Sequence, residues 1–300
     1  MRDINRPIVG IVMVIGAASA WGMAGIFVHT VLANCNGTPV SLAFWRDLTA
    51  FLGLFFFTLF TCPQNLKIKK KDMPWLVGMG IFLGGFHVFY NQSVMQNGAA
   101  VTTVLQAAMP AVVTITAFYL WKEEVTGKKI LSMILIFIGT VLASGMDVFS
   151  MGPINMAGLV AGFCVPFFYA GWSLCGKNLV STYGTPACLA VAFGVAALML
   201  LPFQPFTQAP LPVNMTMALA FLGLMVISTF GAFSLYLMGL NHLPAGIASI
   251  LVMSEIFFAG VCARVFLDER MSGIQLWGAA LVMAGVLFLS YRRNSHPNQG

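Results

Sequence analysis

A single carboxylate, Glu255, interrupts a long apolar stretch near the C-terminus. It lies twelve positions into the apolar run 243–266, which is about 18 Å along a helix and close to the centre of a bilayer. An unpaired carboxylate at that depth costs about 2.5–3.5 kcal/mol on insertion scales, so such a group usually faces a cavity. Two roles stay open for Glu255: it binds a substrate ammonium group or a coupling proton, or it is a protonated carboxyl that is hydrogen-bonded inside the helix bundle.

Two adjacent charges, Arg46 and Asp47, lie seven and eight residues from the start of another apolar run, 39–61. Adjacent residues of a helix point about 100° apart. We therefore expect that the two side chains cannot pair with each other. Each then needs a partner elsewhere, such as another helix, a lipid headgroup or a substrate carboxylate.

Polar side chains also share one helix face at His87, Tyr90 and Asn91, which are spaced i, i+3 and i+4. Such a stripe predicts a cavity wall, where histidine carries protons and tyrosine and asparagine orient a polar ligand. Hydrogen bonding between helices is the alternative. Further residues that would complete an amphipathic pocket are Gln106, Trp21, Tyr169 and Trp172.

Reaction chemistry is not indicated. The chain has no H-E-x-x-H, no G-x-S-x-G, no Walker sequence and no Asp-rich cluster, so we expect no enzyme, no catalytic residue, no metal and no cofactor. The acidic pairs 123–124 and 268–269 follow apolar runs, where carboxylates cap the amide groups of the next helix. We expect a scaffold role for both pairs.

The elements that must position these residues are membrane helices. Of 300 residues, 59% are hydrophobic and 8% charged, and the mean hydropathy is +0.89, far from the balance of a soluble domain. Continuous apolar runs near bilayer length indicate helices and not the alternating strands of a barrel. The ten runs span 8–32, 39–61, 73–95, 99–121, 128–146, 155–176, 184–202, 214–238, 243–266 and 273–291.

The sequence contains an internal repeat of one five-helix unit. Gly37-Thr38-Pro39 returns 147 residues later as Gly184-Thr185-Pro186, and the ending Lys122-Glu123-Glu124 returns as Asp268-Glu269-Arg270 at a spacing of about 145. Each copy holds five helices, and because five is odd the second copy must be inverted. We expect an all-α integral membrane protein in which two inverted five-helix repeats, residues 1–146 and 155–300, surround a central cavity and are joined by a hinge loop, 147–154.

Basic residues set the expected orientation. If the N-terminus is cytoplasmic, twelve of the fifteen Lys and Arg residues fall on the cytoplasmic side, as the positive-inside rule requires. Both termini are then cytoplasmic. Arg264 and Arg270 lie outside, and Arg46 lies within a helix. The basic residues on the cytoplasmic side are Arg2, Arg6, Lys67, Lys69, Lys70, Lys71, Lys122, Lys128, Lys129, Lys177, Arg292 and Arg293.

Trp21-Gly22, Arg46, Pro110 and the doubled acidic ending together resemble the paired EamA domains of the drug/metabolite transporter superfamily. The resemblance implies a carrier for small organic metabolites, often amino acids, commonly moved outward, and a structural role for Arg46. Asp47 is outside the matched pattern and is a candidate specific to this chain.

We therefore expect a secondary transporter that exports small organic metabolites, such as amino acids or amines, by alternating access, either by facilitated movement or coupled to a proton gradient. An uptake carrier of the same fold and a receptor without transport are the alternatives. Its partners are a small-molecule substrate and membrane lipids, with no nucleic acid, in a bacterial inner membrane.

Overall fold

The computed structural model describes residues 5–145, 155–206, 208–210, 213–266 and 271–290. The helices of the first half are α1 (Asn5–Gly22), α2 (Ala24–Ala33), α3 (Pro39–Thr61), η1 (Pro63–Leu66), α4 (Met73–Gln106), α5 (Met109–Trp121) and α6 (Gly127–Ala143). Those of the second are α7 (Met156–Tyr183), α8 (Thr185–Leu200), η2 (Leu201–Phe206), α9 (Met215–Gly223), η3 (Leu224–Gly231), α10 (Ala232–Leu240), α11 (Ala245–Val252), α12 (Glu255–Phe266) and α13 (Gly273–Ser290).

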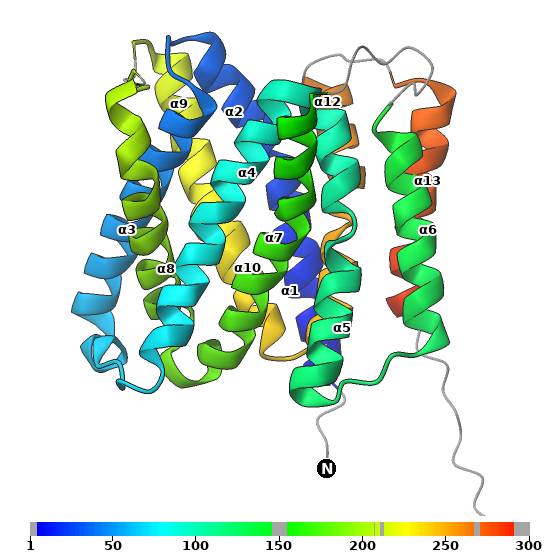
Figure 1. Ribbon diagram of the computed structural model, residues 1–300, viewed down its shortest axis with the longest axis horizontal. Helices are drawn as coiled ribbons and strands as arrows, with labels where there is room; N and C mark the ends of the chain where they lie inside the picture. The colour runs from blue at the N-terminus through cyan, green and yellow to red at the C-terminus, as the bar shows by residue number, and fades with distance from the viewer. Residues whose placement is uncertain (1–4, 146–154, 207, 211–212, 267–270, 291–300) are drawn as a thin grey trace, which may run out of the picture.

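These helices combine into ten membrane-crossing segments within the described residues, as the apolar runs predict. Eight stretches are long and apolar enough to cross a bilayer. One of them, α4, reverses at Gly98, whose φ of 82° and ψ of 163° are not helical, so its last turns belong with α5 to the fourth segment. The fifth segment is α6 (Figure 1). With five segments in each half, α1 starts at one end of the molecule and α7 starts at the other.

Four of the segments are not the continuous α-helices that hydropathy predicts. The first is interrupted at Met23, the fourth at Ala107–Ala108 and the ninth at Met253–Ser254. The eighth widens into the π-helix η3. The sixth is longer than expected, because α7 continues to Tyr183 and holds Lys177 within it rather than in a loop.

The doubled Gly-Thr-Pro phrase starts a helix in both copies. In the first copy the Thr38 hydroxyl accepts a hydrogen bond from the Ser41 amide at 3.2 Å, and Pro39 opens α3, as N-cap chemistry favours. In the second copy Gly184, at a φ of 74°, precedes α8, a conformation that glycine adopts without a steric cost.

Small residues let the helices pack backbone to backbone. A Cβ added to Gly80 or Gly84 of α4 would stand 2.9 Å from the Ala192 carbonyl oxygen or 3.0 Å from the Ala196 Cα of α8. At one edge of the molecule α6 and α13 lie side by side (Figure 1), where a Cβ on Gly139 would stand 2.8 Å from the Gly278 carbonyl oxygen. Close approach of this kind replaces the hydrophobic driving force that lipid does not supply.

Candidate functional site

A cavity of about 650 Å³ lies between the two halves. Its walls come from α1, α2, both parts of α4, α7 and α12. It reaches the end of the molecule where α6 stops and α13 begins, because Ser144 and Gln275 line it there. No residue of the α5–α6 turn or of the α10–α11 turn is among its lining residues, so it stops inside the membrane on the other side.

The structure gathers most of the predicted site residues around this cavity. Glu255 lines it together with Trp21, Arg46, His87, Tyr90, Gln106, Tyr169 and Trp172. Asn91 is half-buried but is not part of the lining, and Asp47 is fully buried behind it. The i, i+3, i+4 stripe thus faces the cavity only through its first two members.

Glu255 is the first residue of α12, directly after the break at Met253–Ser254. The N-terminus of a helix carries a partial positive charge, which favours a carboxylate there. Gln106, the last residue of α4, donates from its Nε2 to the Glu255 Oε1 at 2.9 Å. The two helix breaks of the two repeats therefore meet at the cavity, and the only carboxylate among the described lining residues lies where they meet.

The two breaks are equivalent positions of the repeat. Helical structure starts at Ala99 and Ala245, at Met109 and Glu255, and at Gly127 and Gly273, each pair 146 residues apart. The residue that corresponds to Glu255 is therefore Met109. The repeats share the break, and only the second one places a charge at it.

Arg46 and Asp47 do pair, so the expectation that adjacent residues cannot do so is wrong. Arg46 Nε donates to Asp47 Oδ1 at 3.3 Å, because the long side chain folds back across the difference in direction between the two Cβ atoms. His87 completes the cluster: its Nδ1 is 2.7 Å from Asp47 Oδ2, and its Nε2 contacts an Nη of Arg46. The side chain of Asp47 has no exposed area, whereas 18% of the Arg46 side chain is exposed, toward the cavity.

Aromatic rings form much of the remaining wall. Tyr169 stacks on Trp172 with ring centroids 5.9 Å apart, and Phe86 packs against Tyr169 at 5.1 Å. Trp21 meets Phe233 edge-on at 5.0 Å. These contacts hold the rings in fixed orientations around the site.

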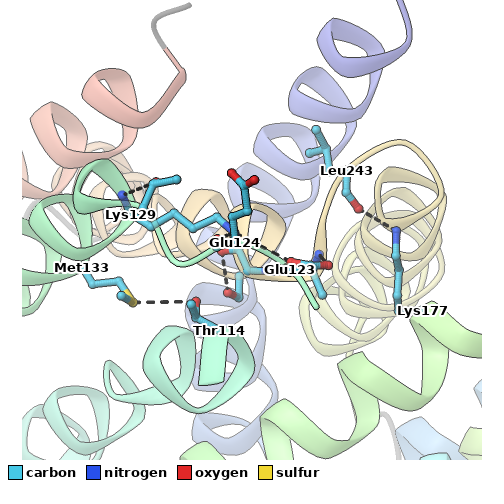
Figure 2. Close-up of polar contacts among 11 residues, drawn as sticks. Thr114, Glu123, Glu124, Lys129, Met133, Lys177 and Leu243 are labelled. Carbon is cyan, nitrogen blue, oxygen red and sulfur yellow. Dashed lines mark hydrogen bonds and ion pairs between the residues drawn. The ribbon is translucent and has the colours of Figure 1, made fainter. Parts of the chain in front are cut away.

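The opposite end is closed by contacts between the repeats (Figure 2). Glu123, just after α5, accepts hydrogen bonds from the Ala245 and Gly246 amides at 2.7 and 3.2 Å, which caps α11 of the other repeat. Lys129 Nζ is 3.8 Å from Glu123 Oε2 and donates to the Glu124 carbonyl oxygen at 2.8 Å. The expected capping role of this acidic residue is confirmed, but the capped helix is not the next one. The matching pair, Asp268 and Glu269, and the loop 147–154 lie outside the described residues.

Two residues have more defined places than the sequence suggested. Lys177 donates to the carbonyl oxygens of Leu240 and Leu243 and so caps the C-terminal end of α10 (Figure 2). His29, near the end of the apolar run 8–32, lines the cavity.

Residues 8–145 and 156–291 both match the profile of the EamA-like transporter family. The chain belongs to this family. Its two EamA repeats are the two halves of the fold, and the cavity lies between them.

Two relatives of this EamA protein are transporters by name. The uncharacterized inner membrane transporter YicL of Salmonella typhimurium is 26% identical over 285 residues, which are 94% of this chain and 95% of YicL. The threonine/homoserine exporter RhtA of the same species is 23% identical over 270 residues, 89% of this chain and 83% of RhtA. A solved crystal structure with a TM-score of 0.79 and 17% identity, covering 93% of this chain and 95% of that one, has the same fold.

Proposed function

We propose that this EamA-family protein is a secondary transporter that exports small organic metabolites, such as amino acids or amines, by alternating access. The observation that carries the proposal is the cavity itself: a space of about 650 Å³ between inverted repeats, with a partly buried carboxylate at the junction of two broken helices. Its volume is that of an ordinary small-molecule site. Broken helices near the membrane midplane are the common form of transporter binding sites.

The direction of transport rests on two arguments. RhtA is an exporter by name, and cytoplasmic termini would make the open end of the cavity the outer one, where an exporter releases its substrate. We also propose that the protein lies in a bacterial inner membrane among lipids that contact its helices. The division into residues 1–146, 147–154 and 155–300 belongs to the same proposal, because alternating access needs two repeats that move against each other.

Glu255 supplies the coupling in this scheme. An ionised carboxylate binds an ammonium group, whereas a protonated one does not, so a proton and the substrate compete for the same oxygen atoms. Exchange of the two across the membrane allows a proton gradient to drive export. The chain has no Walker sequence, which leaves facilitated movement or a proton gradient, and the competition at Glu255 favours the gradient.

Counterflow in proteoliposomes with a panel of amino acids and small amines tests this proposal. We expect at least one compound to exchange saturably, and Glu255→Gln to abolish exchange or its dependence on pH. Glu124→Gln is the matched control, because it also neutralises a carboxylate but at an exposed position outside the cavity. Transport by Glu255→Gln that is unchanged across pH would exclude Glu255 as the coupling residue, and ligand-induced thermal stabilisation without any counterflow would favour a receptor.

A further inference from the structure

Negative formal charges outnumber positive ones around the cavity. Among the described residues that line it, Arg46 is the one formal cation and Glu255 the one formal anion, with His29 and His87 counted as neutral at pH 7. Asp47 lies directly behind Arg46. The cavity and this first layer behind it therefore carry one positive and two negative formal charges.

The positive charge is already paired. Asp47 Oδ1 accepts from Arg46 Nε, and its other oxygen contacts His87 Nδ1. A guanidinium has only N–H donors and no acceptor, so the His87 Nε2 beside it must carry the lone pair. The ring is then the neutral tautomer with its proton on Nδ1, donated to Asp47. Arg46, Asp47 and His87 together form an electrically neutral cluster.

Glu255 has no such compensation among the described residues. Its hydrogen-bond partner is the neutral amide of Gln106, which donates to one carboxylate oxygen at 2.9 Å. The phenols of Tyr90 and Tyr169 line the cavity together with Glu255, and neither is a cation. A partly buried carboxylate within the membrane is costly without a counter-charge, so one positive charge from the ligand would complete the site.

The wall next to this carboxylate also suits a cation. Trp21, Trp172, Tyr169 and Phe86 line the same cavity as Glu255. The faces of aromatic rings attract organic ammonium groups, tryptophan most strongly, and more so where water is excluded. A carboxylate brought by the ligand would find Arg46 already bound to Asp47, and would return the site to a net negative charge.

We propose that this cavity selects organic monocations, that is amines and alkylammonium compounds without a carboxylate, over zwitterionic amino acids. The proposal rests on the proposed function and narrows its substrate class. Glu255 provides the counter-charge, the aromatic rings provide the wall, and Asp47 and His87 keep Arg46 from serving as a carboxylate site. RhtA is by name an exporter of threonine and homoserine, which are zwitterionic amino acids. The substrate class proposed for this protein therefore differs from that of this relative.

Matched ligand pairs test the selectivity directly. Choline and glycine betaine are both permanently quaternary and differ in whether they carry a carboxylate; phenethylamine and L-phenylalanine form an aromatic pair. Thermal stabilisation of the purified full-length protein in detergent measures binding without transport. We expect at least about tenfold tighter binding of the cation than of the zwitterion in a pair that binds. Equal or tighter binding of the zwitterions, or no binding of either cation, would overturn the proposal.

A charge added to the wall tests the mechanism. Thr103 lines the cavity on α4 outside the polar clusters. Thr103→Lys supplies a cation that balances Glu255, and Thr103→Gln fills similar space without charge. Relative to Thr103→Gln, we expect Thr103→Lys to weaken cation binding at least about tenfold and to leave zwitterion binding unchanged or tighter. An equal loss for both ligand classes would refute the charge argument.

The binding and transport assays together distinguish a failure of the cation proposal from a failure of the proposed transport function. If amino acids exchange in proteoliposomes while the cations neither bind nor exchange, the protein is a transporter and the cation proposal is wrong. If the cations bind in a Glu255-dependent manner but nothing exchanges, the cation site stands and the proposed transport is wrong.

Discussion

At the scale of single residues, His87 contacts both members of the Arg46–Asp47 pair. Its imidazole lies between Asp47 on one side and Arg46 on the other. We expect His87→Ala to lower stability by about 1–3 kcal/mol, because it leaves a fully buried Asp47 oxygen without its donor. The thermal unfolding midpoint in detergent measures this loss. Asn91→Ala, one turn further along α4 and outside the cavity lining, is the control.

A double-mutant cycle makes the assignment specific. In the background Asp47→Asn, the additional effect of His87→Ala should be smaller than in the wild type, because the two residues share one interaction. Additive effects would mean that His87 stabilises the protein through packing alone.

Residue types were easier to predict than residue pairs. Hydropathy alone singles out Glu255, Arg46 and His87, because a charged or polar side chain in an apolar run is expensive and therefore informative. The pairing of Arg46 with Asp47 was not predictable from helix geometry, since it depends on the bend of a flexible side chain. The bond from Gln106 to Glu255 joins residues 149 positions apart, and no local spacing reports such a contact.

At the scale of elements, Glu123 acts on a helix of the other repeat. Its carboxylate caps α11 at two amides, so any motion that opens this end must break the cap. A cap is worth about 1 kcal/mol, which corresponds to about a fivefold change in a conformational equilibrium. We expect Glu123→Gln to raise the population open at this end by roughly that factor.

Thiol labelling measures that population. Val113 of α5 is fully buried, and α5 packs against α11, so Val113→Cys in a cysteine-free background reacts only when this end opens. Labelling should be about fivefold faster with Glu123→Gln and unchanged with Glu124→Gln, whose side chain is exposed. Equal labelling rates in all three proteins would show that the cap does not hold this end closed.

Helix breaks were the main feature of the elements that the sequence did not reveal. Hydropathy reports the length of an apolar run. The breaks at Ala107–Ala108 and Met253–Ser254 interrupt the helix, but they do not end the apolar run. The available signal was Pro110, which stands in the first turn of α5, where proline is tolerated because the amide it lacks would be unpaired anyway. It marks the start of a helix.

At the scale of the whole molecule, the internal sequence repeat was enough to predict the architecture of two inverted halves. An odd number of segments per copy forces the second copy to be inverted, and the inversion makes the two broken segments approach the cavity from opposite ends of the bilayer. The same inversion lets one end be closed by Glu123 while the cavity reaches the other end. What the repeat cannot tell is which end is open, since the inversion relates the two ends of the molecule to each other.

Orientation in the membrane is the remaining property of the whole molecule, and two native cysteines report it. Cys35 lies between α2 and α3, and Cys62 follows the end of α3, so they stand at opposite ends of one membrane segment, each half-buried. Lys67 to Lys71 follow Cys62 in the chain, and the positive-inside rule places that end in the cytoplasm. In variants that retain one of these cysteines and replace the other five by alanine, we expect a membrane-impermeant thiol reagent to label Cys35 in intact cells. Cys62 should be labelled only after the cells are permeabilised. The cavity would then open to the outside, as an exporter that has released its substrate requires; the reverse labelling pattern would turn the same structure into a state open to the cytoplasm, and would remove the charge-based argument for export.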